Sequence, residues 1–227
     1  MKPLLSESQD TETLQDLGRA SVQIVHDLKN QLNGLKLYAT FLRKRLEKHA
    51  APADEQETIA KLIAGLERAA ADTTVLVRYG RPVELRRQPA VDVRKILASV
   101  IEGEGDAGVD ARLTGETGAL AGEFDMTALR EAFGAITTGA RSLSRQTGEL
   151  SPLEIHLSRE QHEGLPKALI EWRGVKLDGE ADPFRSFAGG DALRMALAAK
   201  IIKAHGGEAS RAVGGLRVTL PLSDNKP

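Results

Sequence analysis

The chain has 227 residues, with 31 basic against 32 acidic side chains and no cysteine. The near balance of charge argues against nucleic acid as the main partner, and the lack of cysteine excludes disulfides and thiolate metal sites. No apolar run approaches the ~20 residues of a membrane span, and the N-terminal residues lack the pattern of a signal peptide. We therefore expect a cytoplasmic protein of one large or two small domains, with no membrane and no nucleic-acid partner.

The first expected element is a long helix from about Thr11 to His49. Pro52 ends it, because proline cannot continue a helix interior. A second helix is expected from about Glu55 to Arg78, with its own apolar residues at helical spacing. In the first helix the apolar residues form a heptad-like seam, which comprises Leu17, Ile24, Leu28, Leu32, Leu35, Ala39, Leu42 and Leu46.

Two long helices with a short connection predict an antiparallel hairpin. Neither helix can bury so wide an apolar stripe against the other alone, whereas two hairpins paired in a four-helix bundle can bury it. We therefore expect a homodimer; the alternative is that the hairpin packs on its own C-terminal domain. The run Tyr79–Pro82 is typical of a linker, which divides the chain into a helical domain, residues 1–80, and a second domain, residues 81–227.

The second domain mixes short strands and helices, which predicts an α+β fold with helices layered on one sheet. Asp125 is a plausible N-cap, and Gly206-Gly207 is a C-cap signal beside His205, which we expect to interact favourably with a helix dipole. Residues 103–122, apart from one strand, are expected to be loop. The expected strands are Pro82–Arg87, Val109–Leu113, Leu153–Ser158, Ala168–Trp172 and Leu216–Leu222. The expected helices are Val91–Glu102, Asp125–Leu143 and Ala192–Ala204.

One histidine in the first helix lies on the wrong face for packing. At roughly 100° per residue, His26 lies about 160° from Ile24 and from Leu28. Asp27 follows it directly and Asn30 lies one turn on. An adjacent carboxylate can orient an imidazole and take its proton, and an imidazole can carry a phosphoryl group. A solvated surface histidine is the plainer alternative.

The run His26-Asp27-Leu28-Lys29-Asn30 resembles the H-box of bacterial sensor histidine kinases. The resemblance implies that His26 is the phosphoacceptor, which passes its phosphoryl group to an aspartate on a response regulator. It implies that Asp27 assists phosphorylation. It also implies that Asn30 positions water when the protein dephosphorylates its regulator.

The second domain is similar to the ATP-binding domain of the same family, and the resemblance runs from about Thr11 to Leu222. Asp182-Pro183-Phe184 resembles the F-box, residues 188–198 stand where the second glycine box is found, and residues 199–207 match the helix and glycine pair that end the fold. This resemblance implies the ATPase-like α/β sandwich shared with gyrase and Hsp90.

The departures from that pattern fall on the nucleotide site. Ala135 and Gly139 stand where the family carries asparagines, and neither side chain offers an oxygen to a hard cation. Arg173 stands at the aspartate position next to Gly174, and Asp191 would repel a triphosphate. Phosphoryl transfer from ATP relies on positioning and charge neutralisation, so we expect no ATP use, no cofactor and no metal site.

Three functions remain open. The first is a histidine phosphotransferase of a phosphorelay, which carries a phosphoryl group on His26 between receiver-domain aspartates of response regulators. The second is an ATP-dependent histidine kinase with an atypical nucleotide site, in which Asp178-Gly179 is a displaced remnant of the first glycine box. The third is a non-catalytic dimeric scaffold that binds response regulators.

Overall fold

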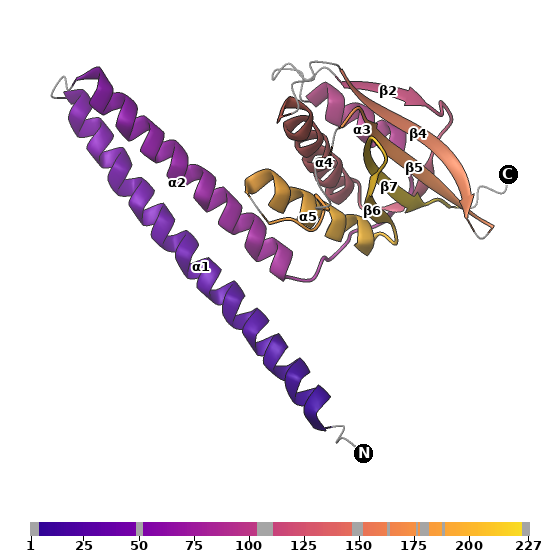
Figure 1. Cartoon of the computed structure of the whole chain (residues 1–227), viewed down its shortest axis with the longest axis horizontal. Coiled ribbons are helices and arrows are strands. Elements are labelled where there is room, and N and C mark those ends of the chain that lie inside the picture. Colours follow the sequence, from indigo (N-terminus) through magenta and orange to yellow (C-terminus); the bar gives the residue numbers. More distant parts are fainter. Residues whose placement is uncertain are drawn as a thin grey trace. The chain divides into compact units, whose positions relative to one another are not determined.

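The computed structural model has two compact units, Met1–Pro82 and Val83–Pro227 (Figure 1). None of the helices in the part of the chain that the structure describes combines the length and apolar character that a membrane span needs. The described residues are 5–48, 52–103, 111–146, 152–162, 164–175, 177, 182–187 and 189–223, with side chains described from residue 23 onward except at 145, 146 and 162.

The first unit is a hairpin of two long helices, α1 (Leu5–Lys48) and α2 (Ala53–Gly80). Lys36 Nζ on α1 lies 2.7 Å from Glu67 Oε1 on α2, and the hydrogen bond from this lysine lowers the pKa of Glu67. The pair links the two helices at the surface of the hairpin. Apolar side chains are buried where the helices meet; they are Ala39, Ile59 and Ile63, with Leu46 and Leu66 packed against them.

Much of the apolar seam of the hairpin remains exposed. The exposed fractions of six seam side chains run from 38% to 68%. A contiguous apolar face of this kind marks an interaction surface rather than a finished core. We call these residues the open seam; they are Ile24, Leu28, Leu35 and Leu42 on α1, with Leu62 and Leu76 on α2.

The second unit is built on a five-stranded mixed sheet with the order β2-β4-β5-β7-β6. β2 runs parallel to β4, and the other neighbours are antiparallel. β1 (Gln88–Asp92) and β3 (Ala121–Phe124) form a separate antiparallel pair. The strands of the large sheet are β2 (Ala111–Gly115), β4 (Leu153–His162), β5 (Leu165–Arg173), β6 (Glu208–Ala212) and β7 (Gly215–Pro221).

Helices α3 (Val93–Gly103), α4 (Met126–Gln146) and α5 (Gly190–Ala204) lie on one side of this sheet (Figure 1). Alternate residues of the central strands face these helices and are fully buried, as period-two packing requires. Trp172 on β5 is the largest of them, and its Nε1 donates to Thr137 Oγ1 on α4 at 3.0 Å. This buried bond ties sheet to helix.

The sequence-based expectations were wrong at several short elements. Residues 82–87 were expected to form a strand but are irregular, because the Arg86 amide donates to the Asp125 carboxylate, at 2.8 Å, instead of to a strand partner. The actual first strand is β1, and the expected loop up to Gly122 ends inside β3. β6 was not expected at all. Asp125 is confirmed as the N-cap of α4, since its Oδ1 accepts from the Ala128 amide at 3.0 Å.

His205 does not act as a charge at a helix end. Its ring is buried, and its Nε2 accepts from the Asp125 amide at 3.1 Å. Since a backbone N–H can only donate, the proton lies on Nδ1, which donates to the Ile201 carbonyl at 2.9 Å. Burial lowers the pKa of His205. The expected structural role is thus filled by a neutral ring, which donates to a carbonyl in the last turn of α5 and accepts from Asp125 at the start of α4.

Candidate functional site

The candidate site on the hairpin centres on His26, which lies on the exposed side of α1 with 52% of its side chain accessible. Its Nδ1 faces two side chains of the same helix. Asp27 Oδ1 is 3.6 Å from Nδ1, and Asn30 Nδ2 is 3.4 Å away. The structure therefore brings together the three residues that the sequence singled out, as neighbours in sequence and one helical turn apart.

The second ring nitrogen of His26 is Nε2. Within the residues that the structure describes, no side chain or backbone group hydrogen-bonds to Nε2 of His26. A neutral imidazole that keeps its proton on Nδ1 has its lone pair on Nε2. When the proton lies on Nδ1, facing Asp27, Nε2 can attack an incoming electrophile; when Asn30 Nδ2 donates to Nδ1, the proton lies on Nε2 instead.

A glutamine one turn before Asp27 was missed at the sequence level. Gln23 Nε2 donates to Asp27 Oδ1 at 3.1 Å, the same oxygen that faces His26. The signal was available, because a glutamine and an aspartate four residues apart on a helix form a known stabilising pair.

Two exposed apolar side chains also share the His26 side of α1. At 100° per residue, Leu37 lies about 20° and Phe41 about 60° around the helix from His26. Their exposed fractions are 61% and 72%, so neither packs within the hairpin. They lie outside the seam, roughly 16 and 22 Å along the helix axis from His26. Their departure from the heptad spacing was the sequence signal.

The second unit shows what surrounds the two positions, 135 and 139, where the resemblance leads one to expect asparagines. Gly139 on α4 is buried, and a Cβ built there would overlap Sδ and Cγ of Met195 on α5. An asparagine at position 139 would require Met195 to move. Ala135, at the other expected asparagine position, is half-buried and offers no oxygen.

Asp191, in the first turn of α5, is held by two neighbouring side chains. Ser142 Oγ on α4 donates to Asp191 Oδ2 at 2.9 Å, and Arg194 Nη1 lies 3.4 Å from Asp191 Oδ1. Asp191 therefore places a carboxylate, not a bare glycine backbone, at the N-terminus of α5. The described residues at these positions do not fit a magnesium-bound nucleotide: Ala135 and Gly139 offer the metal no oxygen, and a carboxylate, paired with Arg194, stands at the helix N-terminus that would otherwise attract a phosphate. Asp178-Gly179, the possible remnant of the glycine box, lies outside the described residues.

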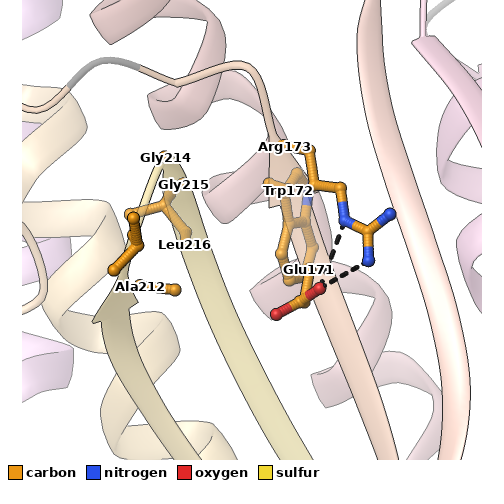
Figure 2. Close-up of a pocket in the computed structure, with 8 residues that line it drawn as sticks. Glu171, Trp172, Arg173, Ala212, Gly214, Gly215 and Leu216 are labelled. Atoms are coloured by element: carbon orange, nitrogen blue, oxygen red, sulfur yellow. Dashed lines mark hydrogen bonds and ion pairs between the residues drawn. The ribbon is translucent and has the colours of Figure 1, made fainter.

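A cavity of about 230 Å³ lies between the end of β5 and the turn that joins β6 to β7 (Figure 2). Its main charged group, Glu171, is held by Arg173 Nη2 at 2.8 Å and by Arg217 Nη2 at 2.8 Å. The hydrogen bond from Arg173, with a second from Arg217, lowers the pKa of Glu171. The carboxylate is already satisfied within the protein, so this cavity presents no evident chemistry.

No protein-family model and no curated protein sequence matches the chain. Solved structures match it in fold. A full-length structure of ShkA in complex with AMPPNP has a TM-score of 0.62 at 17% identity, and the match covers 88% of this chain and 44% of that chain. The Acinetobacter baumannii histidine kinase AdeS has a TM-score of 0.51 at 17% identity, with coverage of 82% and 95%.

At this identity the likeness shows the fold. The chain is a mixed α+β protein with an N-terminal helical hairpin and an ATPase-like sandwich of the kind found in histidine kinases, as the sequence predicted. The chain spans less than half the length of ShkA.

Proposed function

We propose that this chain is a histidine phosphotransferase of a phosphorelay, in which His26 carries a phosphoryl group between receiver-domain aspartates of response regulators. The observation that carries the proposal is the exposed His26, whose Nδ1 faces Asp27 and whose Nε2 is open among the described residues. In the forward step the Nε2 lone pair attacks the phosphorus of a phosphoaspartate. The P–O bond to that aspartate breaks, and its electron pair returns to the carboxylate.

The state of the sandwich supports this choice over autophosphorylation. ATP-dependent transfer needs magnesium ligands and a phosphate cradle. Here Gly139 is packed against Met195, and Asp191 is bonded to Ser142. A phosphoaspartate donor requires neither group, because it brings its own activated phosphoryl.

The open seam supports a homodimer. Fully burying an exposed leucine-sized side chain is worth about 1.5–3 kcal/mol, and these six side chains are 38–68% exposed. Covering what remains exposed on all six therefore favours pairing with a second copy into a four-helix bundle. Leu37 and Phe41 lie off that seam. They remain available to a receiver domain docked over His26, since such a domain of about 120 residues is wide enough to reach both.

The test is transfer of labelled phosphoryl from receiver domains. A panel of receiver domains from the source genome, phosphorylated with labelled acetyl phosphate, is mixed with the full chain and with His26→Ala. We expect acid-labile label on the wild type from at least one receiver and none on His26→Ala. Label on neither protein, with the wild type folded and the receivers phosphorylated, contradicts the proposal.

An ATP-dependent histidine kinase is the second candidate. The observation that favours it is the shared fold with ShkA, whose structure holds AMPPNP. This candidate predicts label on His26 from ATP and magnesium alone. A scaffold without chemistry, the third possibility, predicts regulator binding that survives His26→Ala and no label from either donor.

A further inference from the structure

One oxygen of Asp27 has two neighbours. Gln23 Nε2 donates to Asp27 Oδ1 at 3.1 Å, and the same oxygen lies 3.6 Å from His26 Nδ1. Gln23 precedes Asp27 by four residues, which places the two side chains one turn apart on the helix surface. The carboxylate that faces the imidazole is thus held by a donor on its other side.

Asn30 competes with Asp27 for the same ring nitrogen. Its Nδ2 lies 3.4 Å from His26 Nδ1. When this amide donates, Nδ1 keeps its lone pair and the ring proton lies on Nε2. When Asp27 accepts instead, the proton lies on Nδ1 and the lone pair lies on Nε2. Only the second arrangement leaves Nε2 able to attack phosphorus.

We propose that Gln23 is a positioning residue for His26: by holding Asp27 Oδ1 beside Nδ1, it raises the share of His26 that carries its proton on Nδ1. The 3.6 Å separation exceeds hydrogen-bond length, so small movements of the carboxylate decide whether it accepts from the ring. Without Gln23, Asp27 turns into solvent more often, and Asn30 then sets the tautomer. The role of Gln23 in phosphoryl transfer rests on the proposed function, whereas its effect on the tautomer of His26 can be measured without it.

A purely structural role for Gln23 gives a different result. A glutamine–aspartate pair four residues apart stabilises a helix slightly, and its loss would lower helix stability without changing the tautomer of a neighbouring histidine. The ring nitrogen shifts of His26 separate the two roles, because they report directly which nitrogen carries the proton.

The experiment uses the full chain, the variants Gln23→Leu, Gln23→Lys and Gln23→Glu, and labelled phosphoramidate as a small phosphoryl donor. In that reaction Nε2 attacks phosphorus, the P–N bond breaks and ammonia leaves, so no partner protein is needed. The ¹⁵N shifts of the neutral His26 ring and the rate of labelling are both measured. Gln31→Leu is the matched control: Gln31 is an exposed glutamine four residues after Asp27, at the same spacing as Gln23, but among the described residues the side-chain donor to Asp27 is Gln23 and not Gln31.

We expect Gln23→Leu to lower both the Nδ1-protonated share and the labelling rate, by about 1.5- to 2-fold. Gln23→Lys restores a donor to Asp27 and recovers both quantities. Gln23→Glu places a like charge beside Asp27 and lowers both further. The control Gln31→Leu leaves both unchanged.

An unchanged tautomer share in Gln23→Leu and Gln23→Glu overturns the inference, whatever the labelling rate. A lower rate in Gln23→Leu that Gln23→Lys does not recover also overturns it. If the tautomer responds as expected but no receiver domain phosphorylates the wild type, the positioning role stands and the phosphorelay function fails.

Discussion

The hairpin and the sandwich of this chain differ in how much of their apolar surface is exposed. In the described part of the hairpin only Ala39, Ile59 and Ile63 are buried apolar residues, while the open seam and His26 are exposed. The sandwich has a core around Trp172, and Met195 packs against Gly139, one of the positions where the family carries an asparagine. The described hairpin therefore leaves much of its apolar seam exposed, whereas the second unit buries most of the apolar side chains of its sheet and helices.

This difference is what the proposed phosphotransferase function predicts for the two units. A fold can lose an activity while its packing survives, because a core depends on volume and pattern whereas an active site depends on a few polar atoms. Met195 against Gly139 preserves packing at the cost of the ligand position. Nothing comparable covers His26 among the described residues. Substitutions in the exposed seam of the hairpin and in the packed contacts of the sandwich should therefore have different effects.

The largest effect is expected at the open seam. Leu35→Glu places a charge in the proposed dimer interface of each copy, and burying an unpaired charge is strongly unfavourable. We expect the dimer dissociation constant to rise about 100-fold or more, measured by sedimentation equilibrium. Leu37→Glu, a similarly exposed leucine off the seam, is the matched control and should remain dimeric. Equal dimerisation by both variants would show that the seam is not the interface.

The next effect tests the closed sandwich. Gly139→Asn restores the amide typical of the nucleotide site but forces Met195 to move, so we expect a loss of about 1–3 kcal/mol in the free energy of unfolding. The measurement is urea unfolding, and adding Met195→Ala should recover part of the loss.

Gly134 offers the matched control for that experiment. A Cβ built at this position on the same helix meets nothing within 4 Å. Gly134→Ala should therefore raise stability by about 0.5–1 kcal/mol through helix propensity. If Gly139→Asn proves as stable as the wild type, the α4–α5 contact is looser than the structure shows.

A smaller effect concerns His205 in the sandwich. Because burial lowers the pKa of His205 in the folded state, the unfolded chain takes up the proton first as the pH falls. The free energy of unfolding should therefore fall as the pH drops below about 6.5, by at most about 1.4 kcal/mol per pH unit. Urea unfolding between about pH 7.5 and 5.5 checks this, above the range where carboxylates titrate.

Two further measurements assign the pH dependence of the unfolding free energy to His205. His205→Gln should flatten the dependence over this range. If that variant does not fold, the ring signals of His205 in the wild type should still titrate below the usual range of histidine. A stability that is constant over these pH values, or that rises as the pH falls, is the contrary result.

The sequence predicted the long elements well for a physical reason. The spacing of Ile24, Leu28, Leu35 and Leu42 repeats over many helical turns, so the pattern of α1 could not be confused with a strand. Asn30 was found because residues four apart share a helix face, and Asp27 because it directly follows His26 in the sequence. These contacts are local, and local contacts follow from spacing.

The remaining features depend on contacts that spacing does not reveal. β1, β3 and β6 are four or five residues long, and pairing with neighbours rather than apolar alternation holds them in the sheets. His205 is neutral because of Asp125, 80 residues away in the chain. The contact of Met195 with Gly139 joins two helices far apart in sequence. Such pairings come from tertiary packing, which can override local preference.

The most direct test of the account is to incubate the full chain with labelled ATP and magnesium, beside the same protein mixed with a phosphorylated receiver domain. We predict acid-labile label on His26 from the receiver and none from ATP. Label from ATP that is absent in His26→Ala would show that the sandwich still delivers a phosphoryl group. That result would contradict the central claim that the hairpin has kept its chemistry while the sandwich has lost its own.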